Sequence, residues 1–241
     1  MKYIKSSIIL LAFCHLFILA GCYTTQNTTQ TAANVQSPIV PQAAENNTSV
    51  VLKDTDIQEF ASRVQWPEFD PGTTQKPVYT INSGINDGVW VEAKGYFHIP
   101  LDQIFQDLTD VQVMGPTYLT NDIQQKDLVK TQVLTTYTMD IKMRYIMSVE
   151  FSVGVRIEAF YDQDGQLKGY IYQSNKSDGT RFITRIDENL VVRQLESNWF
   201  SVEFQSLNVA TMNKEEETRK HIESLFERWE SMSQASDETE E

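Results

Sequence analysis

The feature that most constrains the fold is a long run of strand-like sequence, residues 129–207, followed by an amphipathic helix. Apolar and polar side chains alternate along 129–139 and again along 149–157, a period typical of strands with one buried face. Three short sequences typical of turns divide the run into strands: DQDG at 162–165, NKSDG at 175–179 and Asp187-Glu188-Asn189. A last strand is expected over Trp199–Leu207. Strands joined by such short turns pair antiparallel, so the run predicts one antiparallel sheet.

The helix predicted after this run spans residues 213–232. Asn213 and Glu216 match an N-terminal cap, and the acidic residues 215–217 suit the positive end of a helix dipole. Apolar side chains recur at helical spacing on one side, and they are Ile222, Leu225, Phe226, Trp229 and Met232. Such a stripe has to be buried, and the sheet is the surface that can bury it.

The segment before the run places a strand directly ahead of a short helix. Alternating apolar residues over 88–99 predict the strand, and Pro100 ends it, because proline suits the first position of a helix. Residues 101–108, LDQIFQDL, then carry apolar side chains at helical spacing. Further upstream, 56–65 predicts a helix and 67–77 is rich in turn-forming residues. The chain is therefore expected to be an α+β protein.

Two stretches carry a family resemblance: YFHIPLDQIFQDLTD at 96–110 and the helix at 213–232. The first is similar to the opening strand, proline and short helix of START-like (SRPBCC) domains, and the second resembles their C-terminal helix. The resemblance covers residues 88–232. It implies a helix-grip fold, in which a curved antiparallel sheet wraps around a long C-terminal helix and leaves a hollow between them.

A hollow of this kind implies an apolar ligand pocket between the sheet and the last helix. The residues expected to line it are Tyr137, Met139, Phe151, Trp199, Leu225, Phe226 and Trp229. Pattern alone does not separate a side chain that lines a pocket from one that fills the core. Both interpretations of these seven residues therefore stay open.

Cysteine and histidine are scarce in the part of the chain expected to fold. Cys14 and Cys22 both lie near the N-terminus, so neither a thiolate metal site nor a disulfide framework is expected in the domain. His98 is expected at the surface or at a pocket rim, and His221 on a solvated helix face. Their spacing matches no metal-binding motif, so no metal site is predicted.

The carboxylates near the short helix receive a similarly simple interpretation. Two of the carboxylates Asp102, Asp107 and Asp110 could act together in general acid–base catalysis, but helix capping and solubility explain all three more simply. The sequence contains no nucleophile elbow, phosphate-binding loop or dinucleotide motif. We therefore expect a protein that is not an enzyme and has no cofactor.

The N-terminus carries a targeting signal. Two lysines precede an apolar stretch, Ser6–Ala20, that is too short to span a bilayer and matches a signal peptide. It ends in Leu19-Ala20-Gly21-Cys22, which is similar to the lipobox of bacterial lipoproteins. That resemblance implies removal of residues 1–21 and lipid attachment at Cys22, and several acyl chains would anchor the protein firmly. The alternative is an ordinary signal peptide that ends near a cysteine by chance.

The residues that follow suggest a location and a layout. In the bacterial lipoproteins that this N-terminus resembles, an aspartate after the cysteine commonly means retention in the inner membrane, so Tyr23 at that place implies an outer-membrane lipoprotein that faces the periplasm. In an organism with a single membrane, the lipid would hold the protein on the outer face. Residues 22–50 are rich in Thr, Gln and Asn and are expected to form a flexible tether. An extension of helix and loop is expected over 51–87, ahead of the START-like domain, and a disordered acidic tail over 233–241.

Charge narrows the choice of partners. The chain has 20 Lys and Arg against 33 Asp and Glu, and its net charge of −13 repels nucleic-acid phosphates. The expected function is non-catalytic binding of a lipid or other apolar small molecule by a membrane-anchored lipoprotein. An envelope scaffold or assembly partner that acts through protein contacts is the alternative, and a polyketide cyclase- or dehydratase-like enzyme is the third hypothesis.

Overall fold

The computed structural model describes residues 52–53, 62–116, 120–144, 148–195, 198–211 and 215–237. All of them lie within one compact unit, Thr48–Glu241. The expected signal peptide, the lipid attachment at Cys22 and the tether lie outside the described residues. In the described part of the chain, no helix combines the length and the apolar character needed to cross a bilayer.

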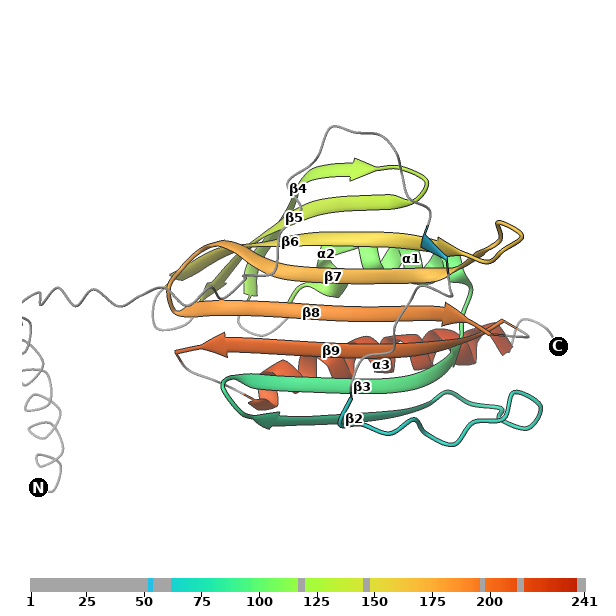
Figure 1. Ribbon diagram of the computed structural model, residues 1–241. Coiled ribbons are helices and arrows are strands. Elements are labelled where there is room, and N and C mark those ends of the chain that lie inside the picture. Colours follow the sequence, from blue (N-terminus) through green and yellow to red (C-terminus); the bar gives the residue numbers. More distant parts are fainter. Residues whose placement is uncertain are drawn as a thin grey trace, which may run out of the picture. The chain divides into compact units, whose positions relative to one another are not determined.

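One antiparallel sheet forms the framework of the domain (Figure 1). Its strands are β1 (Leu52–Lys53), β2 (Val78–Ile85), β3 (Val89–His98), β4 (Thr120–Lys130), β5 (Leu134–Arg144), β6 (Ser148–Tyr161), β7 (Leu167–Gly179), β8 (Ile183–Gln194) and β9 (Trp199–Ala210). They follow the order β2-β3-β9-β8-β7-β6-β5-β4, with every neighbouring pair antiparallel. The short β1 pairs in parallel with the end of β6.

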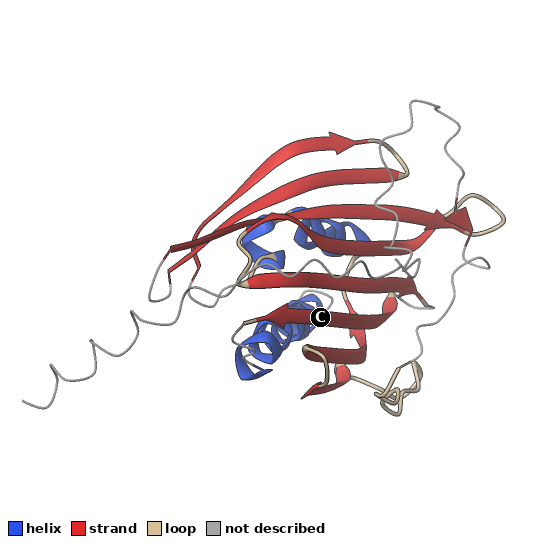
Figure 2. Ribbon diagram, turned by 60° about the vertical axis from the view of Figure 1, so that its left-hand side comes forward, coloured by secondary structure: helices blue, strands red, loops and turns tan. Residues whose placement is uncertain are grey.

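The helices lie together on one face of the sheet, which curves around them (Figure 2). They are α1 (Leu101–Thr109), α2 (Val111–Met114) and α3 (Glu215–Asp237). The long α3 packs along β3 and β2, whereas α1 contacts β7 and α2 contacts β4. The fold is a helix-grip. The fold class expected from the sequence is therefore confirmed.

Aromatic side chains join α3 to the first strands of the sheet. The ring of Phe97 on β3 lies 5.4 Å from that of Phe226 and 5.8 Å from that of Trp229, both edge-on. Tyr79 on β2 meets Phe226 at 5.5 Å. Edge-to-face pairs at these distances stabilise a core beyond the area that they bury. This contact determines which side of α3 faces the sheet.

The opposite, outer face of β3 and β9 is covered by residues 62–77, which we call the strap. Phe69 of the strap stacks on Tyr96 with ring centroids 4.1 Å apart, and it meets Trp199 at 4.9 Å. Beneath the strap, Nζ of Lys94 lies 3.0 Å from a carboxylate oxygen of Glu203, and both residues are buried. The sheet is thus covered on both faces along these two strands.

Two predicted strand boundaries are wrong. The stretch 129–139 is not one strand, because the chain reverses at residues 131–133, where the backbone N–H of Thr131 donates to the carbonyl of Leu134 at 2.8 Å. The NKSDG signal at 175–179 is the end of β7 rather than a turn, and the reversal follows at residues 180–182. The first reversal was not predicted at all, and the second falls a few residues after the predicted position.

The predicted turn at Asp187-Glu188-Asn189 is also wrong, because these residues lie in the middle of β8. Each of them pairs with β7 on one side and with β9 on the other. Local turn propensity favours a reversal here, but pairing on both edges of the strand overrides that propensity. The error matters, because Glu188 belongs to the inner face.

The N-terminal extension and the acidic tail also differ from the prediction. Part of the helix expected over 56–65 lies outside the described residues, and residues 62–65 are not helical. Residues 78–85, expected to belong to a helix-and-loop extension, form β2 and pair with β3. At the other end, residues 233–237 of the expected disordered tail continue α3.

Candidate functional site

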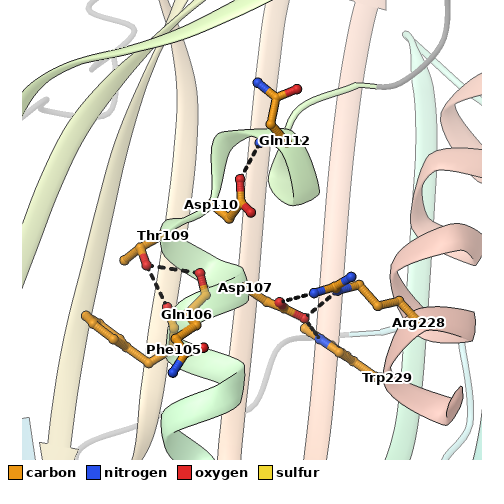
Figure 3. Close-up of polar contacts among 8 residues, drawn as sticks. All are labelled: Phe105, Gln106, Asp107, Thr109, Asp110, Gln112, Arg228 and Trp229. Carbon is orange, nitrogen blue, oxygen red and sulfur yellow. Dashed lines mark hydrogen bonds and ion pairs between the residues drawn. The ribbon is translucent and has the colours of Figure 1, made fainter. Parts of the chain in front are cut away.

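Asp107 on α1 fixes the C-terminal half of α3 (Figure 3). Nε and Nη2 of Arg228 donate to its two carboxylate oxygens, each at 2.9 Å, and Nε1 of Trp229 donates at 3.0 Å. Asp107 is only 3% exposed, whereas the Arg228 side chain is 47% exposed. Bidentate, charge-assisted bonds of this kind are strong and directional. The interpretation of Asp107 as a solubilising group is therefore wrong, since it joins two helices.

Asp110 and Tyr137 determine where the two short helices lie. Oδ1 of Asp110 accepts from the backbone N–H of Gln112 at 2.8 Å, so its predicted capping role is confirmed, for α2 (Figure 3). The hydroxyl of Tyr137, on β5, donates to the carbonyl of Leu108 at 2.8 Å. These bonds hold the end of α1 and the start of α2 against the inner face of the sheet.

His221 lies in the N-terminal half of α3, next to the end of α2. Burial lowers the pKa of its imidazole to about 4, although a hydrogen bond with the backbone of Met114 opposes the shift. The ring is therefore neutral near pH 7. The expectation of a fully solvated His221 is wrong, because the residue is partly buried and its imidazole contacts the backbone of Met114 at the end of α2.

On the sheet side of the same interior, polar residues from three neighbouring strands share one face. The strand register places Ser174 of β7 beside Glu188 of β8, and Glu188 beside Ser206 of β9. The hydroxyl of Ser174 donates to Oε2 of Glu188 at 2.7 Å. The buried hydroxyl of Tyr172 interacts with Ser174, whereas the buried Oδ1 of Asn208 has no hydrogen-bond partner among the described residues. We call these five residues the polar cluster.

Burial dominates the electrostatics of the polar cluster. It raises the pKa of Glu188, and the hydrogen bond from Ser174 opposes that shift. Burial also raises the pKa of Tyr137 and that of Tyr172 well above their ordinary values, and the charge of Glu188 adds to both shifts. Among the described residues, no basic side chain contributes to any of these shifts. Burial thus favours the neutral form of the Glu188 carboxyl.

The interior is not packed evenly around the polar cluster. Glu188 and His221 are each only partly buried, although burial is the largest cause of the pKa shift of both. The apolar side chains of the same region are only partly buried, and they are Val111, Val113, Ile123, Met143, Val149, Ile183 and Ile186. By contrast, Phe226 and Trp229 are fully buried. We call the region where α2 and the start of α3 face the sheet the half-buried end.

Six of the seven residues expected to line a pocket point into this interior. They are Tyr137, Met139, Phe151, Leu225, Phe226 and Trp229, all buried members of the hydrophobic core. Trp199 does not join them. Its neighbour Phe200 faces the helices, so Trp199 points to the outer face, where its ring lies 4.9 Å from Phe69 and 5.4 Å from His98. Because strand side chains alternate between faces, a shift of one residue separates these two positions.

Sequence reasoning missed the polar cluster because a turn was expected at Glu188. Once 183–194 is treated as one strand, Glu188 shares a face with Ile186, Leu190 and Val192. A lone acidic residue in an otherwise apolar face is the signal that could have revealed it. In the ranges that the structure describes, no three histidine, cysteine or acidic side chains come close enough together to hold a metal ion.

Comparisons with known proteins return distant likenesses in structure alone. No protein-family model matches the chain. No curated protein matches it either. Among solved structures, it resembles TTHA0849 from Thermus thermophilus, with 14% identity and a TM-score of 0.39, over 61% of this chain and 98% of that one.

Two human proteins resemble the chain to a similar degree. The StarD13 lipid transfer and protein localization domain is 12% identical, with a TM-score of 0.40 over 57% of this chain and 73% of that one. StAR-related lipid transfer protein 5 is 9% identical, with a TM-score of 0.39 over 73% of this chain and 85% of that one. The residues of the site are placed by the strand order and by the position of α3, and these likenesses are not used to place them.

Proposed function

We propose that the domain binds a lipid or other apolar small molecule in its half-buried end and catalyses no reaction there. The observation that carries this proposal is that Glu188 and His221, on the inner side of the sheet and on α3, are only partly buried and lie in the same region as partly buried apolar side chains. A ligand that covers the apolar side chains gains about 25 cal/mol for each Å² of apolar surface removed from water. Helix α3 would form one wall of the site and the inner face of the sheet the other.

We further propose that the protein is anchored through Cys22 in the outer membrane, with the domain facing the periplasm. The sequence Leu19-Ala20-Gly21-Cys22 supports the anchor, and the polar composition of 22–50 supports a flexible tether. A coil of that length has a root-mean-square reach of roughly 30 Å, which carries the domain beyond the lipid head groups. A binding domain held there meets lipids and apolar solutes of the envelope.

The binding proposal can be tested on the mature chain without its lipid, residues 22–241 with Cys22→Ser. We expect saturable binding of the uncharged fluorescent probe N-phenyl-1-naphthylamine. Ile186→Trp adds bulk within the half-buried end and should abolish binding. Ile85→Trp makes a matched change at a side chain that is 62% exposed, and it should leave binding intact. Non-saturable fluorescence, together with no co-purifying ligand in a native mass spectrum, would contradict the proposal.

A second candidate function, protein–protein contact in the envelope, is favoured by the edge of the sheet. Strand β4 ends the strand order, and its Leu128 and Val129 are 53% and 58% exposed. Edge strands with exposed apolar side chains are surfaces on which another chain can pair. Cross-linking from a cysteine placed at Leu128, compared with one placed at Gly165, should recover an envelope partner selectively. Equal or empty recovery from both sites would refute this role.

A further inference from the structure

We propose that the polar cluster receives the polar end of the ligand and that this end is a hydrogen-bond donor, a hydroxyl or amino group. The same site should discriminate against ligands that end in a carboxylate or a phosphate. This inference rests on the ligand-binding function proposed above, and it adds the chemical class of the head group. It comes from three features of the cluster: its unmet acceptor, its charge and its surroundings.

One oxygen atom of the cluster lacks a hydrogen-bond partner. Oδ1 of Asn208 is a buried acceptor without a partner in the described part of the chain. Buried polar atoms without partners are destabilising. A ligand that brings a donor to this place satisfies this acceptor.

Glu188 supplies the strongest acceptor of the cluster. Its Oε2 accepts from the hydroxyl of Ser174 at 2.7 Å. An ionised carboxyl offers about four acceptor positions on its two oxygens, so one bond from Ser174 leaves several of them available. The residue is only partly buried, so part of its surface remains accessible. A hydroxyl or an amine is therefore the group that Glu188 can bind directly.

The charges around Glu188 exclude an anionic head group. On the same face of β7, Lys176 lies at the register position of Val153, two residues beyond Ser174. On β8, Arg185 forms an ion pair with Asp187, whose side chain lies on the other face from Glu188. The imidazole of His221, from α3, is neutral near pH 7. An anion brought here would itself be removed from water beside the Glu188 carboxyl, and it would repel that carboxyl wherever Glu188 is ionised.

The surroundings of the cluster imply that the rest of the ligand is apolar. Ile186 lies two residues before Glu188 on the same face of β8, and the register places it beside Asn208. Val111 and Val113 of α2 are likewise only partly buried against the core. A molecule whose polar end reaches Glu188 therefore has its body against apolar side chains. The ligand class that fits is an amphipathic alcohol or amine.

The test compares three probes of equal chain length on the mature chain without its lipid: 1-dodecanol, dodecylamine and dodecanoic acid. Each probe displaces N-phenyl-1-naphthylamine at neutral pH, and its displacement constant is measured. We expect the alcohol and the amine to bind at least about tenfold more tightly than the acid. Glu188→Gln removes the charge, so it should weaken amine binding about tenfold and reduce the discrimination against the acid.

A neighbouring substitution provides the control. Asp187→Asn removes the same charge one residue away, on the opposite face of β8, and should leave all three constants unchanged within about twofold. Equal binding of the three probes, or tightest binding of the acid, overturns the head-group inference and leaves the proposed function in place. Failure of every probe to bind overturns both. If Glu188→Gln does not fold, the comparison of the three probes on the unsubstituted domain still decides the inference.

Discussion

Removing the carboxylate of Asp107 should separate α1 from α3 and lower the free energy of unfolding by about 3 kcal/mol. In Asp107→Ala, the buried indole N–H of Trp229 loses its acceptor, which costs about 1–3 kcal/mol. The Arg228 side chain is 47% exposed and can turn towards water, so the loss of its ion pair with Asp107 adds only about 0.5 kcal/mol. The space left by the carboxylate adds the remainder, since neighbouring groups only partly fill it. The 3–5 kcal/mol typical of a broken buried pair is therefore an upper bound.

Urea unfolding, followed by tryptophan fluorescence, measures this change. With a urea dependence of about 2–3 kcal/mol per molar for a domain of this size, the midpoint should fall by roughly 1–1.5 M. Asp102→Ala is the matched control, because Asp102 is exposed in the first turn of the same helix. That change should cost less than about 0.5 kcal/mol. The reasoning fails if the two substitutions have equal effects or if Asp107→Ala leaves the midpoint unchanged.

Three further outcomes are expected. Gly169→Ala should cost at least about 3 kcal/mol of unfolding free energy in the same urea assay, because φ is +156° there and a Cβ would lie 1.9 Å from a backbone carbonyl. Gly165→Ala, at a φ of +78° in open space, should cost only about 1 kcal/mol. In the folded protein His221 stays neutral down to a pKa of about 4, whereas in the unfolded chain it takes up a proton near its ordinary pKa. As pH falls from about 7 towards 4, this difference lowers the free energy of unfolding by up to about 3 kcal/mol. His221→Gln should remove that part of the pH dependence, and identical pH profiles of the two proteins would disprove it. Cys22→Ser should abolish palmitate labelling in cells, and continued labelling would disprove the lipid anchor.

The sequence was sufficient to predict the fold class, because its strongest patterns are those that span a whole element. The apolar stripe of α3 and the alternation along β6 each depend on many residues. Turn positions depend on three or four residues, and tertiary pairing overrode them at Glu188. Strand β2 was missed because its inner face carries Tyr79 and Ile81 among polar residues, which gives too weak an alternation.

The site was predictable only in its apolar part. Residues such as Phe151 and Leu225 are identified by period alone, and the structure places them in the core. Trp199 and Phe200 are adjacent aromatic residues, and either could be the one that faces the core. The pairing of β9 with β3 shows which of them lies on the inner face. The polar cluster depends on three strands that lie side by side in the sheet. A single sequence contains no record of that register, so no pattern within one strand predicts it.

The strap gives the domain a mechanical property that follows from where the chain enters it. Ahead of the strap, β1 pairs with the end of β6, and residues 62–77 then cover the outer face of β3 and β9. A pull on the chain ahead of β1 therefore loads the pairing of β1 with β6 first, and next the contacts of Phe69 with Tyr96 and Trp199. Neither set of contacts involves α3 or the inner-face side chains of the polar cluster. Tension from a membrane anchor would thus be absorbed on the side of the sheet that faces away from α3.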